Sequence, residues 1–183
     1  MKISCNKRKA YLMFGMLIGI PKRKRGLVSW LYDAQRVVFI AGAEAIKAGD
    51  RRIAARHLWS GMLQVVENNQ PSVQYSLVGA IFKKLGVSLG GEVQENRNQM
   101  LHDKATMMKA KVCLGNEAKK VIQIAYKESF NLGHSYIGAG HLLLGLVGLN
   151  SKAQRDAIEY QDFDLQKVRD AFMDCLRSDI SSL

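Results

Sequence analysis

The amino-acid sequence predicts an all-α fold of two pseudo-symmetric four-helix repeats, eight helices in total. Three observations support this prediction. Apolar residues recur at the three- and four-residue spacing of helices. The apolar residues are mainly Leu, Ile, Val, Ala and Met, whereas the chain has only two prolines and 8% aromatic residues. The third observation is an internal repeat. We expect no β-sheet.

The repeat becomes visible when the sequence is aligned with itself at an offset of 84 positions. Residues 34–63 then align with residues 118–147, and eleven of the 30 aligned positions are identical, among them His57 with His141. Farther along, the offset falls to 76, so the first copy carries eight extra residues around "VVENNQP". Because each unit alone is too small to bury a good core, we expect the two to stack about a pseudo-twofold axis.

Each repeat is expected to begin with a helix that ends at a glycine, Gly49 or Gly133, in the position of a C-terminal cap. The apolar faces of these two helices comprise Val37, Ile40, Ala41 and Ala45, and Val121, Ile124, Ala125 and Ser129. A second helix is expected to begin at the histidine. Its apolar face comprises Leu58, Met62 and Val65 in the first copy, and Leu142, Leu146 and Leu149 in the second.

The later helices of each repeat are less regular in sequence. A third helix is expected at Val73–Leu85 in the first copy and roughly at Lys152–Tyr160 in the second, and a fourth is expected to begin at Glu92 or Asp164. The expected core comprises Val37, Ile40, Ala41, Ile53, Leu58, Met62, Val121, Ile124, Ala125, Ile137, Leu142, Leu146, Val168 and Phe172.

The chain divides into a tail and a double repeat. The tail covers residues 1–28 and the double repeat residues 29–183, with repeat 1 at 29–101, a connector at 102–114 and repeat 2 at 115–183. The formal net charge is +11, but eight basic residues and no acidic residue lie in the tail. The remainder is therefore only mildly basic, unlike a folded domain with a nucleic-acid-binding stripe.

The tail leaves several interpretations open. Its apolar stretch at residues 10–20 is shorter than the roughly 20 residues that span a bilayer. Pro21 and four cations follow this stretch, where a signal peptide would have a small-residue cleavage site. The tail would be disordered or packed on the domain, attached to anionic lipid, part of an export signal, or the product of a misassigned start codon. Binding of nucleic acid or an anionic membrane surface through this tail is the alternative function.

The histidines and cysteines do not form a recognisable catalytic or metal-binding motif. We expect His57 and His141 to be structural, since an imidazole at a helix start can bond backbone groups while its ring packs. No HExxH motif is present, and Ser135 beside His134 lacks a G-x-S-x-G context. Three cysteines without a CxxC pair favour a reducing, cytoplasmic compartment. We therefore expect no enzymatic activity, cofactor, metal or small-molecule substrate.

The second copy, "AKKVIQIAYKESFNLGHSYIGAGHLLLGL", closely resembles the second repeat of the N-terminal domain of Clp/Hsp100 chaperones of the ClpA and ClpC type. That family has L-G-H-x-Y-[IV]-G-T-E-H-[IL]-L-L-G-L here, and the first copy resembles its first repeat more weakly. The resemblance covers about residues 30–178. It implies a helical protein-docking module, found in the family fused to AAA+ ATPase rings. No G-x-x-x-x-G-K-[ST] motif for phosphate binding occurs in this chain.

The resemblance therefore implies a free-standing docking domain whose partners are a Clp ATPase, its adaptor or its client proteins. In the ClpC branch, the glutamate of G-T-E-H in both repeats helps to bind phosphorylated arginine, assisted by a threonine near the start of each first helix. Arg56 and Gly140 replace the glutamates here, and Leu31 and Gly115 replace the threonines. Phosphoarginine recognition in the ClpC manner is thus not expected.

The loops before the two histidines are the candidate protein-binding surface. "DRRIAARH" offers Arg51, Arg52 and Arg56, whereas "HSYIGAGH" offers Tyr136 and a small notch lined by Gly138 and Gly140. A surface that is basic on one side and aromatic on the other suits an acidic or hydrophobic protein segment. A solvated arginine cluster without a partner is the alternative interpretation.

Overall fold

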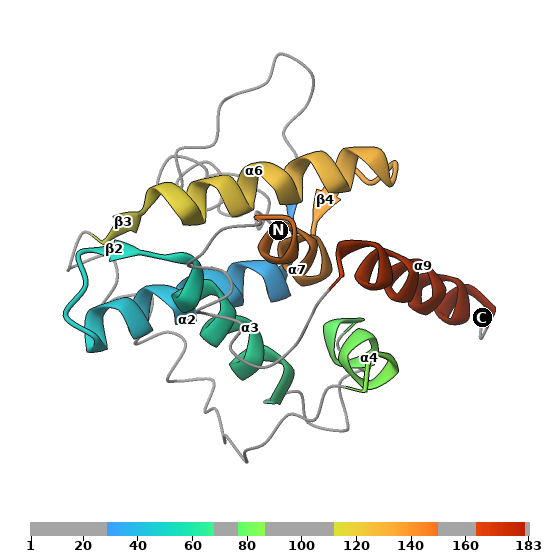
Figure 1. The fold of residues 1–183 in the computed structure, drawn as a ribbon, viewed down its shortest axis with the longest axis horizontal. Helices are drawn as coiled ribbons and strands as arrows, with labels where there is room; N and C mark the ends of the chain where they lie inside the picture. The colour runs from blue at the N-terminus through green and yellow to red at the C-terminus, as the bar shows by residue number, and fades with distance from the viewer. Residues whose placement is uncertain (1–28, 68–76, 87–111, 150–163, 182–183) are drawn as a thin grey trace, which may run out of the picture.

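The computed structural model is mostly helical, as predicted (Figure 1). The structure describes residues 29–67, 77–86, 112–149 and 164–181. Six of the eight predicted helices lie within these residues. The elements in chain order are β1 (Ser29–Trp30), α2 (Tyr32–Lys47), β2 (Arg52–Ile53), α3 (Ala55–Glu67), α4 (Leu77–Lys84), β3 (Cys113–Leu114), α6 (Asn116–Asn131), β4 (Tyr136–Ile137), α7 (Ala139–Val147) and α9 (Leu165–Ser181).

Four two-residue strands join the repeats to each other. They form two parallel pairs, β1 with β4 and β2 with β3. At the 84-residue offset β1 is equivalent to β3, and β2 to β4, so each pair joins the first strand of one repeat to the second strand of the other. The helices repeat this exchange, because α2 contacts α7 and α3 contacts α6. Reciprocal contacts of this kind are the mark of a twofold arrangement.

The expectation of no β-sheet was wrong in this detail. The strands are too short to give the alternating apolar pattern by which a strand is recognised in sequence. They form because the extended segment before each helix carries backbone groups that need partners, and the equivalent segment of the other repeat supplies them. Ile53 and Ile137 project from these segments into the core and are 1% and 0% exposed.

The first helices of the two repeats end in the same way. Gly49 and Gly133 both have φ of 73°, a left-handed conformation that glycine adopts without strain. In each case the next residue, Asp50 or His134, donates its N–H to a carbonyl five residues earlier. These are Schellman motifs. The predicted glycine caps are therefore present, and they turn the chain toward β2 and β4.

Within each repeat the first two helices cross at a glycine. A Cβ atom added to Gly61 of α3 would overlap the carbonyl oxygen of Val37, and one added to Gly145 of α7 would overlap that of Val121. Only glycine permits such a close approach between α2 and α3 or between α6 and α7. Around these crossings all predicted core residues are buried except Ile124, which is half-buried on α6.

α9 joins repeat 2 to repeat 1. It begins after Asp164, whose Oδ1 accepts the N–H of Gln166 at 3.0 Å, so the predicted helix start is confirmed. It packs against α4, on the right of Figure 1, and Lys84 Nζ of α4 lies 2.5 Å from Asp174 Oδ2. In contrast to the expected start at the histidines, α3 and α7 begin two residues earlier, at Ala55 and Ala139.

An ion pair also fixes α9 to α6. The Arg169 guanidinium donates to both carboxylate oxygens of Glu128, with Nε 3.0 Å from Oε2 and Nη2 2.5 Å from Oε1. Glu128 is 6% exposed, so its charge is desolvated and depends on this partner.

Some predicted elements lie outside the described residues. These are the helix at 152–160, the helix from Glu92, the connector up to residue 111, the first part of the helix predicted at Val73–Leu85, and the tail.

Candidate protein-binding faces

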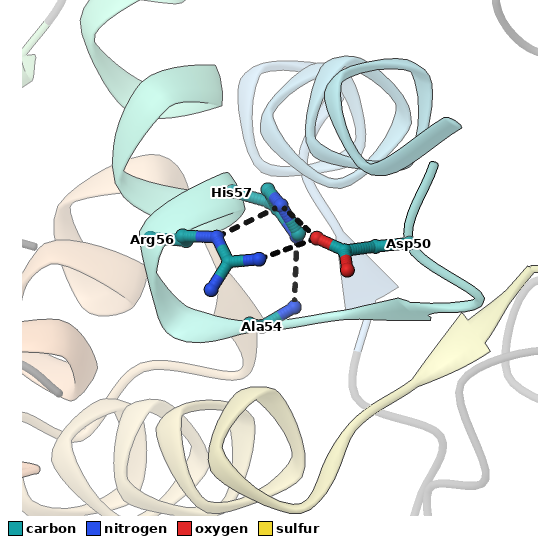
Figure 2. Close-up of polar contacts among 4 residues, drawn as sticks. All are labelled: Asp50, Ala54, Arg56 and His57. Atoms are coloured by element: carbon teal, nitrogen blue, oxygen red, sulfur yellow. Dashed lines mark hydrogen bonds and ion pairs between the residues drawn. The ribbon is translucent and has the colours of Figure 1, made fainter. Parts of the chain in front are cut away.

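His57 lies at the start of α3 and is 5% exposed. Its Nδ1 accepts the backbone N–H of Ala54 at 3.0 Å, and its Nε2 lies 3.2 Å from Asp50 Oδ2 (Figure 2). Because Nδ1 accepts a hydrogen bond, the neutral ring carries its proton on Nε2 and donates it to Asp50. Arg56 Nε lies 3.2 Å from the same nitrogen and, since that nitrogen already bears a proton, acts as a neighbouring charge.

His141 repeats this geometry at the start of α7 and is 1% exposed. Its Nδ1 accepts the N–H of Gly138 at 3.0 Å, and its Nε2 lies 2.9 Å from Nδ1 of His134, the residue equivalent to Asp50. A glutamate or glutamine three residues into a helix makes the same backbone bond in a capping box. The two imidazoles thus have the geometry of structural groups, and their structural role stays a prediction.

Burial determines the protonation of both histidines. It lowers the pKa of His141 to about 4, and the adjacent His134 adds to the decrease. Burial and then the charge of Arg56 lower the pKa of His57, against the opposing effect of Asp50. Near neutral pH both rings are therefore uncharged.

The three candidate arginines are all exposed, but the structure distinguishes one of them. Arg56 forms an ion pair with Asp50, and Figure 2 shows its guanidinium turned toward that carboxylate. Among the described residues, Arg51 and Arg52 have no ion-pair partner. Arg52 lies beside the start of α6, since its Cβ is 3.7 Å from where a Cβ on Gly115 would be.

The notch predicted at Gly138 and Gly140 is not open. A Cβ atom on Gly140 would overlap the ring of Phe172, and one on Gly138 would lie 3.3 Å from Leu31 Cδ1. Both glycines are buried. The glycine positions therefore provide room for neighbouring side chains of the chain itself. Tyr136 is half-buried and stacks on His134, with ring centroids 5.0 Å apart.

The comparisons with known proteins agree with this architecture. Residues 32–159 match the family model described as the Clp repeat (R) N-terminal domain. The chain belongs to this family. The resemblance to a Clp N-terminal domain seen in the sequence is thus confirmed.

Individual relatives match over a small part of their own length. The negative regulator of genetic competence ClpC/MecB of Bacillus subtilis is 28% identical over 145 residues, which are 79% of this chain and 17% of that protein. The chaperone protein ClpB of Oceanobacillus iheyensis is 26% identical over 151 residues, 81% of this chain and 17% of that protein. The fold is also that of the N-terminal domain of the caseinolytic protease associated chaperone ClpD from Arabidopsis thaliana. The TM-score is 0.52, with 14% identity over 85% of this chain and 99% of that one.

The contacts that three residues make at these faces were not predicted from sequence. Asp50 contacts His57 and Arg56, Asp33 reaches α7, and Phe172 covers Gly140. The sequence placed Asp50 only as the residue after a cap glycine, and it predicted Phe172 only as a core residue. No group of three or more His, Cys, Asp or Glu side chains in the described ranges could hold a metal ion. Within the same residues no helix combines the length and apolar character that crossing a membrane requires.

Proposed function

We propose that this chain is a non-enzymatic protein-binding module that acts as an accessory or adaptor-like component of a Clp ATPase and protease system. The partner would be the ATPase, its adaptor or a client protein. Family membership supports this, and the proposed surface comprises Arg51, Arg52 and Arg56, because Gly138 and Gly140 are buried and Tyr136 is half-buried. The proposal includes no cofactor, metal or small-molecule substrate, and it places the chain in the cytoplasm.

The observation that carries the proposal is the pair of exposed arginines, Arg51 and Arg52, which have no ion-pair partner among the described residues. Arginine side chains are common at protein interfaces, where the planar guanidinium can donate two parallel hydrogen bonds to one carboxylate. Because Arg56 already pairs with Asp50, it would contribute mainly by fixing the loop.

Capture from a native lysate tests the proposal. The full chain is immobilised, and bound proteins are identified by mass spectrometry beside an N-terminal domain of a Clp ATPase as a positive control. We expect a Clp ATPase or its adaptor to be recovered, and recovery to fall when Arg51, Arg52 and Arg56 are changed to Glu. Recovery of neither, while the control domain recovers its adaptor, would contradict the proposal. Recovery of nucleic acid or lipid that depends on Arg23 and Arg25 would instead support the alternative function of the tail.

A further inference from the structure

The two repeats present equivalent faces whose contents differ. We define the repeat-1 face as residues 50–57 with 115–120, and the repeat-2 face as residues 134–141 with 31–36. Each face combines parts of both repeats because the strands pair reciprocally, β2 with β3 and β4 with β1. At the 84-residue offset the two faces match position by position.

On the repeat-2 face, the chain's own side chains occupy the start of α7. Asp33 Oδ2 accepts the N–H of Ala139, the first residue of α7, at 3.1 Å. This carboxylate therefore accepts a backbone N–H that has no partner within the helix, and its negative charge is stabilised by the positive end of the helix dipole. Phe172 fills the space above Gly140 and packs against His141, with ring centroids 5.3 Å apart. A protein segment that contacts the start of α7 would have to displace both side chains.

Within the part of the chain that the structure describes, the repeat-1 face has neither feature. Glu117 stands in the position of Asp33, but among the described residues no side chain accepts the N–H of Ala55, the equivalent of Ala139. Arg56 stands in the position of Gly140, and 60% of its side chain is exposed although it pairs with Asp50. In the described ranges, no side chain covers Arg56 as Phe172 covers Gly140.

The charges of the two faces differ as well. The repeat-1 face has five cationic and two anionic side chains: Arg51, Arg52, Arg56, Lys119 and Lys120 against Asp50 and Glu117. The equivalent positions of the repeat-2 face hold one of each, Arg36 and Asp33. Arg51 and Arg52 correspond to the uncharged Ser135 and Tyr136. The excess positive charge therefore belongs to one face alone.

We infer that the chain binds a single acidic protein segment, on the repeat-1 face, and that Asp33 and Phe172 keep the repeat-2 face from taking a second one. The inference rests on the proposed protein-binding function. It specifies that the bound segment is acidic and that one segment binds per chain. Carboxylates of the segment pair with Arg51 and Arg52, which have no ion-pair partner among the described residues. Charge complementarity of this kind selects the partner and raises the association rate.

Binding of a synthetic acidic peptide to the full chain tests the inference. The probe is a fluorescein-labelled 12-residue peptide of alternating Glu and Ser, measured by fluorescence anisotropy and, for stoichiometry, by calorimetry. The variant R51E/R52E changes two exposed side chains and should leave the unfolding midpoint unchanged. The variant R23E/R25E makes the same change of net charge in the tail and is the matched control.

We expect one peptide per chain, affinity about tenfold lower for R51E/R52E, and a much smaller loss for R23E/R25E. Equal losses for both variants would overturn the inference, because they would show attraction to net charge alone. Binding of two peptides per chain would contradict the claim that the repeat-2 face takes no segment. Tighter binding of a 12-nucleotide oligo-dT, lost in R51E/R52E, would assign the face to nucleic acid. If the peptide fails to bind while the wild-type chain still recovers a Clp component from lysate, the inference fails and the proposed function stands.

Discussion

His57 and His141 accept the backbone hydrogen bond that a glutamate or glutamine usually accepts at the third position of a helix. Their Nδ1 atoms accept the N–H of Ala54 and Gly138, and their rings are buried. Replacing either histidine with alanine leaves that donor without a partner and removes a packed ring. We expect a loss of about 1–3 kcal/mol in the free energy of unfolding, measured with urea near neutral pH.

His141→Gln should recover part of this loss because glutamine can accept the same hydrogen bond. Ser135→Ala, at an exposed neighbouring position, is the control and should change little. Unchanged stability of His141→Ala together with lost partner binding would make His141 a binding residue instead.

The same residue predicts how stability depends on pH. In the unfolded chain His141 takes up a proton near its ordinary pKa of 6.5, whereas in the folded chain burial lowers the pKa to about 4. Between these values the unfolded state binds more protons, so stability is full above about pH 6.5 and falls as the pH is lowered toward 4. The slope from this one group is at most about 1.4 kcal/mol per pH unit.

Urea unfolding of the wild type and His141→Gln across this pH range measures the effect. The two free energies should converge as the pH falls, because only the wild type carries the buried imidazole. Parallel curves would show that His141 is not held neutral by the fold.

At the scale of elements, the two helix crossings set the geometry of each repeat. Gly145→Ala places a methyl group against the carbonyl oxygen of Val121, and a backbone atom in a packed helix cannot move aside cheaply. We expect destabilisation of about 1–3 kcal/mol or more, and a similar value for Gly61→Ala in the other repeat. Thermal and urea unfolding would measure it, with the exposed Lys119→Ala as control. A neutral or stabilising Gly145→Ala would contradict the close crossing.

The attachment of α9 depends on the pair formed by Arg169 and Glu128. Arg169→Met leaves a buried carboxylate without its partner, and we expect a loss of about 1–3 kcal/mol, reduced from the value for a fully buried pair because the arginine side chain is 35% exposed. The double variant R169M/E128Q should be more stable than R169M alone, since it removes the unpaired charge. Urea unfolding tests this order, and the reverse order would show that the ion pair does not hold α9.

These elements also show what the sequence could and could not reveal. Identical residues at a fixed offset, such as Gly49 with Gly133, predicted the paired helices and their caps, and every residue predicted for the core except Ile124 is buried. The two-residue strands were missed because they carry no periodic pattern. Phe172 over Gly140 and Asp33 on Ala139 were missed because these contacts join residues 32 and 106 positions apart, and spacing along the chain holds no signal for them.

At the scale of the whole molecule, the pseudo-twofold arrangement gives each position of one face an equivalent position on the other, so the two faces can be compared directly. A symmetric double repeat would offer two like binding surfaces. Here Asp33 and Phe172 occupy the start of α7 on one face, and the other face carries exposed arginines.

Amide hydrogen exchange of the full chain, with and without the Clp component recovered from lysate, tests the central claim most directly because it needs no substitution. The account predicts slower exchange for peptides covering residues 50–57 when the partner is bound, and no change for the equivalent residues 134–141. Equal slowing of both segments, or slowing of residues 134–141 alone, would contradict it.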